Sequence, residues 1–148
     1  MSIWVAMVGM LLLALSLAVK VPEEIRTRAE MTADVTSVNF DAYRTSVINY
    51  MRDNPGASGT TPDGSLTWLP GYIRDARWTH VIQGGTLFTY STGAVGDDVL
   101  QSLYAKHQKS FMVGAKGAGG TLVSARGIDT GIVLPAAIPI GAIVIVGS

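Results

Sequence analysis

The chain has 148 residues, which is enough for one modest domain together with a membrane anchor. Its formal net charge is zero, so the charge balance gives no reason to expect nucleic acid as a partner. It contains no cysteine, which excludes disulfides, thiol catalysis and cysteine-ligated metal centres. The fold must therefore be held together by packing and hydrogen bonds.

The apolar N-terminus predicts a transmembrane helix over residues 1–20. No charged side chain precedes Lys20, and the apolar run makes a helix of roughly 26 Å, at the short end of what spans a bilayer. A cleaved signal peptide is the alternative, with Ser16-x-Ala18 as a small-residue cleavage site. The absence of Lys or Arg before the run favours a retained anchor, formed by Ile3, Trp4, Leu11, Leu12, Leu13, Leu15 and Leu17.

Residues 21–55 predict an amphipathic continuation of the same helix. Pro22 removes one helical hydrogen bond and predicts a kink, and Pro55 followed by Gly56 predicts the end of the helix. Apolar side chains recur along this segment, first at Ile25, Ala29, Met31, Val35, Val38 and Ala42. The residues that follow step by three and four and give one apolar stripe, formed by Phe40, Tyr43, Val47, Tyr50 and Met51. This stripe is either core against a sheet or a docking face for a partner helix.

Residues 56–148 predict a small domain of the α+β class, in which the long helix packs on an antiparallel sheet. Gly84-Gly85 separates two runs of β-favouring residues, and Asp97 is the expected N-cap of a short helix. In chain order we expect a polar loop (56–65), strands 76–83 and 86–91, a helix (98–107), strands 111–114 and 121–124 around a glycine-rich loop (115–120), and a buried terminal strand (143–146).

No group of residues forms a convincing active site. His80 and His107 lack metal-ligand spacing, and we expect both to be surface or turn residues. Asp97 and Asp98 are better explained by helix capping than as paired catalytic carboxylates. The glycine-rich run 114–120 lacks the ending of a phosphate-binding loop. We therefore expect a protein that is not an enzyme, with no catalytic residue, metal or cofactor.

Three large aromatic residues, Trp68, Tyr72 and Trp78, occur within a short stretch. They could form an exposed interaction patch or cover the apolar face of the long helix. The second interpretation is favoured, because that face otherwise has nothing to cover it.

An apolar helix that continues into an amphipathic one, followed by an antiparallel sheet, resembles the layout of type IV pilins, including the position of Pro22. The chain differs from true pilins in two respects. It has no basic leader ending in Gly before the apolar run, and the run contains no Glu. We therefore do not expect processing by prepilin peptidase or incorporation as a major pilus subunit.

The whole chain resembles the small PilM proteins of type IVb (thin) pilus systems, which occur on conjugative plasmids. The features that carry the resemblance are the start Met1-Ser2-Ile3-Trp4, the helical segment Asn39-Phe40-Asp41-Ala42-Tyr43-Arg44, and residues 84–120 with their short helix. The resemblance implies a non-enzymatic component of pilin transport or of the pilus basal body. It also implies a single pass through the bacterial inner membrane, with the C-terminal domain in the periplasm.

The expected partners are the membrane and pilins or other pilus assembly proteins, with no nucleic acid and no small-molecule substrate. A literal count of positive charges disagrees with this orientation, because Lys20, Arg26 and Arg28 follow the apolar run and would place the domain in the cytoplasm. The alternative function is a secreted or periplasmic binding domain with a cleaved signal segment.

Overall fold

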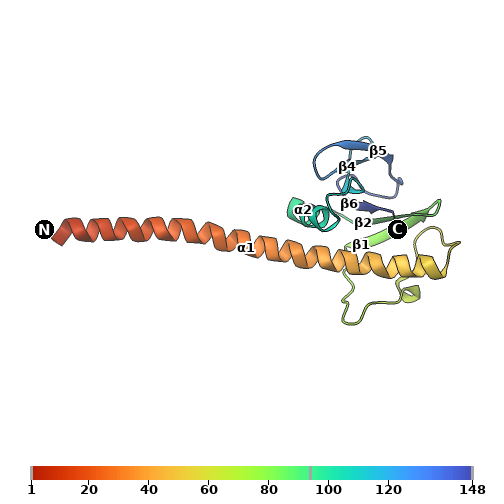
Figure 1. The fold of residues 1–148 in the computed structure, drawn as a ribbon, viewed down its shortest axis with the longest axis horizontal. Coiled ribbons are helices and arrows are strands. Elements are labelled where there is room, and N and C mark those ends of the chain that lie inside the picture. Colours follow the sequence, from red (N-terminus) through yellow and green to blue (C-terminus); the bar gives the residue numbers. More distant parts are fainter. Residues whose placement is uncertain (1, 94, 148) are drawn as a thin grey trace. The chain divides into compact units, whose positions relative to one another are not determined.

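The computed structural model describes the backbone of residues 2–93 and 95–147 and the side chains of residues 26–93 and 95–147. The chain divides into two units, Met1–Thr32 and Ala33–Ser148, and helix α1 (Ser2–Asp53) contributes residues to both (Figure 1). In the first unit, Arg26 forms an exposed ion pair with Glu30 at 3.1 Å, one helical turn away. The predicted anchor residues and the kink predicted at Pro22 lie outside the described side chains.

Helix α1 ends where the sequence predicts a helix end. The backbone N–H and the side-chain amide of Asn54 both donate to the carbonyl of Tyr50, at 2.9 Å each. Pro55 then prevents the helix from continuing, because it disfavours the helical conformation of the residue before it. The 3₁₀-helix η1 (Asp63–Ser65) follows in the loop that leads to the sheet.

A six-stranded antiparallel sheet forms the body of the second unit, in the order β1-β2-β6-β3-β4-β5 (Figure 1). Its strands are β1 (Trp78–Gln83), β2 (Thr86–Ser91), β3 (Val113–Lys116), β4 (Thr121–Ser124), β5 (Asp129–Val133) and β6 (Ile143–Val146). Gly84 and Gly85 connect β1 to β2 with φ of 58° and 77°, the backbone of a two-residue hairpin turn that favours glycine. The predicted α+β class with an antiparallel sheet is confirmed.

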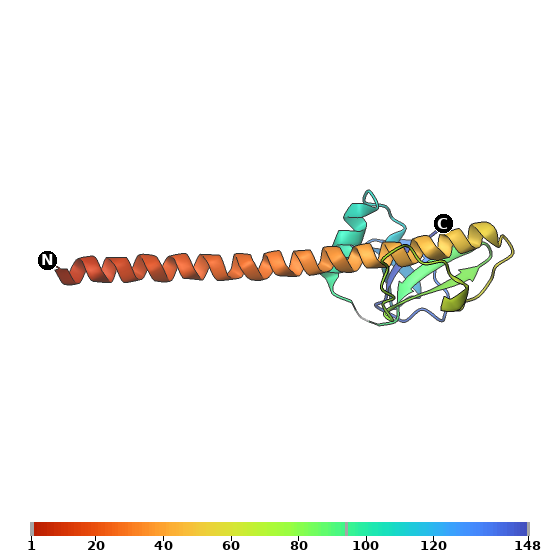
Figure 2. The same ribbon diagram turned by 90° about the horizontal axis from the view of Figure 1, so that it is seen from below.

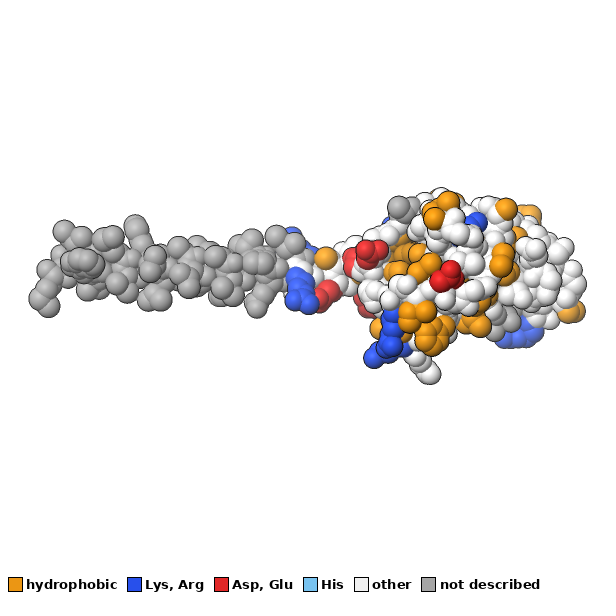
Figure 3. All heavy atoms as spheres, turned by 90° about the horizontal axis from the view of Figure 1, so that it is seen from above, with side chains coloured by type: hydrophobic (Ala, Val, Ile, Leu, Met, Phe, Trp, Pro, Cys, Tyr) orange, Lys and Arg blue, Asp and Glu red, His pale blue; other side chains and the backbone are white. Residues whose placement is uncertain are grey.

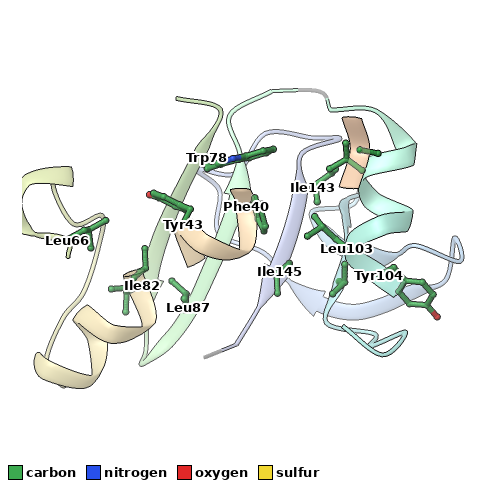
Figure 4. Close-up of a cluster of buried hydrophobic side chains, with 14 residues drawn as sticks. Phe40, Tyr43, Leu66, Trp78, Ile82, Leu87, Leu103, Tyr104, Ile143 and Ile145 are labelled. Carbon is green, nitrogen blue, oxygen red and sulfur yellow. The ribbon is translucent and has the colours of Figure 1, made fainter. Parts of the chain in front are cut away.

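The last strand of the chain, β6, lies in the middle of the sheet, between β2 and β3. All four of its residues are buried, and they alternate between the two faces. Ile143 and Ile145 belong to the larger core cluster, which joins the sheet to α1 and to helix α2 (Asp97–Lys106) (Figure 4). Figure 2 shows the C-terminal part of α1 lying across the sheet, with α2 on one side and η1 on the other.

The opposite face of the sheet is covered by the segment that leads into β6. Val144 and Val146 pack there against Leu134 and Ile138. Lys116, although buried, satisfies its ammonium group through this segment, donating to the carbonyls of Pro135 at 3.0 Å and Ile138 at 2.8 Å. The sheet is therefore covered on both faces.

Three sequence predictions in this domain are wrong in detail. The strand expected at 111–114 lies two residues later, because Phe111 and Met112 are exposed in a turn and Gly114 is held against the backbone of Val123. Strand β5 is missing from the sequence prediction. It is an edge strand with exposed side chains at every second position, and its pairing with β4 has an irregular register. The N-cap of α2 is Gly96, and Asp97 is the first helical residue.

Candidate functional site

The segment between η1 and β1 folds over α1 through a stack of aromatic rings. Trp68 lies between Tyr43 of α1, at a centroid distance of 6.0 Å, and Tyr72, at 5.1 Å. Arg74 completes the arrangement with its guanidinium 4.6 Å from the centroid of the Tyr43 ring. Aromatic and cation–π contacts of this kind hold the segment against the helix.

Asn39 of α1 fixes the next part of this segment with hydrogen bonds. Its side-chain amide donates to the carbonyl of Ile73 at 3.0 Å. Its carbonyl oxygen accepts from the Trp78 indole at 2.8 Å and from the Tyr72 hydroxyl at 3.5 Å. Because every polar group of the Asn39 side chain is engaged, residues 69–73 have a defined position beside α1.

An apolar groove of about 330 Å³ lies between α1 and this fixed segment. Its side chains remain open to solvent, with Val35 70% exposed, Val38 54% and Ile73 80%. Exposed apolar surface gathered in one concave place is characteristic of an interaction site. The full lining is Val35, Val38, Asn39, Ala42, Leu69, Pro70, Gly71, Tyr72 and Ile73.

None of the described residues that line the groove is charged, and two nearby carboxylates of α1 have partners at α2. Asp34 forms an ion pair with Lys106 of α2 at 2.8 Å, and Asp41 accepts from His107 at 2.9 Å. The hydrogen bond and the charge of Lys106 lower the pKa of the Asp34 carboxyl. On the face shown in Figure 3, acidic and basic side chains are interspersed with hydrophobic ones.

The predicted stripe of α1 is core over most of its length. Phe40, Tyr43 and Val47 are fully buried against the sheet, and Figure 4 shows Phe40 and Tyr43 pointing into the cluster. Tyr50 and Met51 are partly buried at the margin of the same cluster.

The three aromatic residues pack against the core that α1 helps to form, which is the interpretation favoured from the sequence, and they do not form one exposed surface. Trp78 is fully buried, with its ring edge-to-face on Phe40 at 4.8 Å, while Trp68 and Tyr72 are only partly buried. The groove residues that sequence reasoning did not single out include Leu69 and Ile73. Their signal in the sequence is weak, because they stand in a loop without periodicity.

The prediction that His80 is a surface or turn residue is wrong. His80 is completely buried in β1, where its Nε2 accepts from the backbone N–H of Thr61 at 3.0 Å and its Nδ1 lies 2.8 Å from the Tyr43 hydroxyl. Burial lowers the pKa of His80 to about 4 and raises the pKa of Tyr43 to about 12. His80 therefore connects α1, β1 and the loop before η1 as a neutral hydrogen-bonding group.

Two further cavities differ from the groove in chemistry. One, of about 440 Å³, lies at the end of α1 and is lined mainly by polar side chains, including Asn49 and Arg52. The other, also of about 440 Å³, lies beside the β1–β2 turn and includes Phe88 and Leu134.

Within residues 26–93 and 95–147, no cluster of three or more His, Cys, Asp or Glu side chains could hold a metal ion. In the same residues, no helix has a stretch long and apolar enough to cross a membrane.

The structure thus defines a small α+β protein whose most distinctive surface is an apolar groove beside a helix. The PilM family model matches residues 7–146, almost the whole length, and the chain belongs to the PilM family. The resemblance predicted from the sequence is confirmed, and family membership indicates a role in pilus biogenesis.

Among solved structures, the chain is similar to the crystal structure of a protein named PilM from Escherichia coli B7A, with a TM-score of 0.60 and 19% sequence identity. The similarity covers 79% of this chain and 92% of that chain, and it shows a shared fold. A search of curated proteins found no match.

Proposed function

We propose that the chain is a non-enzymatic inner-membrane component of type IVb pilus assembly, acting in pilin transport or in the basal body. The observation that carries this proposal is the uncharged apolar groove on α1, in a protein of the PilM family. Covering exposed apolar side chains such as Val38 and Ile73 with an apolar protein surface removes them from water, which stabilises the complex. The partners in this proposal are pilins or other assembly proteins.

In this proposal, residues 1–20 form a single-pass anchor, residues 21–55 its amphipathic continuation, and residues 56–148 a pilin-like domain in the periplasm. The apolar composition before Lys20 supports the anchor. The packing of α1 residues such as Phe40 on an antiparallel sheet supports the pilin-like layout. The anchor keeps the domain beside the membrane in which pilus subunits are assembled.

Topology is tested by fusing alkaline phosphatase after Ser148 and by sequencing the N-terminus of the protein from isolated membranes. We expect an active fusion, since the enzyme folds in the periplasm, and a mature chain that starts at Met1 or Ser2. An inactive fusion, or a chain that begins at Val19 or later, contradicts the proposed anchor.

The functional test uses a strain that carries the thin pilus and lacks this gene. Wild-type protein should restore pili and conjugation in liquid, whereas Val38→Lys should not, because it places a charge in the groove. The matched control is Val133→Lys, an equal change at another exposed valine. Pili that persist without the gene contradict the proposed function.

A further inference from the structure

We propose that a second surface, at the end of the sheet where α2 finishes, contacts an anionic lipid surface. We call it the basic–apolar patch, and it consists of Lys109, Phe111, Met112, Arg126 and Ile128. Its three apolar side chains remain in contact with solvent, with exposed fractions of 54% for Phe111, 47% for Met112 and 51% for Ile128. Its two basic residues are exposed as well. Apolar side chains that stand in water beside cations match the interface of an anionic bilayer.

The patch is made by two turns that meet at one end of the sheet. Gly114 of β3 pairs with Ser124 of β4, so the residues before β3 and those after β4 lie at the same end. Helix α2 contacts both turns through Tyr104, whose carbonyl accepts from the backbone N–H of Lys109 at 2.8 Å. The Arg126 guanidinium lies 5.9 Å from the centroid of the Tyr104 ring, which Figure 4 shows at the margin of the core cluster. Tyr104 therefore brings Lys109 and Arg126 onto one side of the domain.

The turn that carries Phe111 and Met112 is fixed in an unusual backbone conformation. Gln108 and Lys109 have φ of 54° and 61°, in the left-handed region that residues with a Cβ seldom adopt. The backbone N–H of Met112 donates to the Ser110 hydroxyl at 3.2 Å within the same turn. Backbone conformations of this kind persist only where the surrounding contacts enforce them. The turn therefore holds Phe111 and Met112 in solvent instead of burying them in the core.

The two cations of the patch have no acidic partner in the described part of the chain. Neither Lys109 nor Arg126 forms an ion pair there, whereas Lys106 at the end of α2 is paired with Asp34 at 2.8 Å. The acidic residue next to the patch in sequence is Asp129, and its carboxylate accepts from a hydroxyl and a backbone N–H of its own hairpin at 2.9 Å each. The patch therefore carries positive charge that a layer of phosphate groups would neutralise.

The inference rests on the proposed function in one respect, the membrane anchor. Helix α2 is fastened to the start of the second unit, because Lys106 pairs with Asp34 and the Ser102 hydroxyl lies 2.9 Å from that of Ser37. Only residues 21–33 separate this part of α1 from the proposed anchor. A short tether keeps the bilayer at a high effective concentration beside the domain, so a small patch is sufficient to bind it. A bilayer interface supplies phosphate groups for the cations and acyl chains for the apolar side chains, whereas an acidic protein surface supplies only the negative charge.

The test places a fluorescent probe on the patch of the full chain reconstituted in lipid vesicles. Because the wild-type chain has no cysteine, Met112→Cys provides a single thiol for an environment-sensitive dye. Val133→Cys is the matched control, since Val133 is exposed and pairs with Thr121, at the other end of β4 from the patch. In vesicles with about 30% phosphatidylglycerol, spin-labelled lipids should quench the dye at position 112 about threefold more than the dye at position 133.

Neutral lipid and charge reversal show whether the cations make the contact. The difference between the two positions should disappear in vesicles of phosphatidylcholine alone, and also after Lys109→Glu is combined with Arg126→Glu. The double reversal should leave the thermal unfolding midpoint almost unchanged, because both residues are exposed. Equal quenching at the two positions in anionic vesicles overturns the inference, as does a difference that persists in neutral vesicles. A dye at position 112 that is shielded from water but not quenched by lipid also overturns it, and would assign the patch to a protein contact.

Failure of the proposed anchor is seen separately, by flotation of the chain with the vesicles. A chain that does not float contradicts the anchor and the lipid contact together. A chain that floats but shows equal quenching at the two positions leaves the anchor in place and removes only the lipid contact.

Discussion

Acidification tests the buried hydrogen-bond chain centred on His80. Thr61 donates its backbone N–H to Nε2 of His80, so Nε2 must carry the lone pair and the single proton of the neutral ring must be on Nδ1. That proton is donated to the Tyr43 hydroxyl at 2.8 Å. Protonating Nε2 would place two N–H groups against each other and charge a buried ring, so the folded protein resists it.

The size of the effect follows from the pKa. Burial, with a smaller contribution from Arg74, lowers the pKa of His80 from 6.5 to about 4 against the opposing charge of Asp63. The unfolded chain therefore takes up a proton first, and stability is lost as the pH falls from about 6.5 towards 4. The loss is about 2 kcal/mol at pH 5 and approaches about 3 kcal/mol below pH 4.

The assay combines NMR titration with denaturant unfolding of the full chain in a mild detergent. His80 and His107 are the only histidines, so the ring spectrum contains two signals, and His80→Gln identifies one of them by its loss. Between pH 7 and 5, wild type should lose about 2 kcal/mol more of its unfolding free energy than His80→Gln. A His80 signal that titrates near pH 6.5, or equal losses in the two proteins, refutes the reasoning.

Two further predictions concern packing. Val47→Asp buries an unpaired charge in the core and should lower the free energy of unfolding by about 3–5 kcal/mol, seen as a lower urea midpoint. Val38→Asp, on the exposed side of the same helix, should lower it by about 0.5 kcal/mol or less. Gly114→Ala should lower the free energy of unfolding by about 3 kcal/mol, because a Cβ there would lie 2.1 Å from the carbonyl oxygen of Val123. A Cβ at Gly64 would meet no atom within 4 Å, so Gly64→Ala should leave the urea midpoint almost unchanged. Equal midpoints within either pair would contradict the packing described for it.

Several elements follow from local rules and could be predicted from the sequence. Gly84-Gly85 supplies the positive φ of a tight hairpin turn, so the β1–β2 pair is specified over a few residues. Pro55 ends α1 through the conformation of its neighbour. The β-branched run Ile143–Val146 predicts a buried strand because it has no polar face to expose. Each of these signals lies within a few residues of the structure it determines.

The sequence by itself thus determined the α+β class, most of the element order and the family of the protein. Only the tertiary structure decided that β6 lies between β2 and β3, that β1 buries His80, and that α1 leaves a second apolar side uncovered. Helical spacing shows that both Phe40 and Val38 lie on apolar sides of one helix, but the side that meets the sheet depends on contacts between residues far apart in the chain. The groove exists because Asn39 holds a distant loop beside the side left open, and no local pattern contains that hydrogen bond.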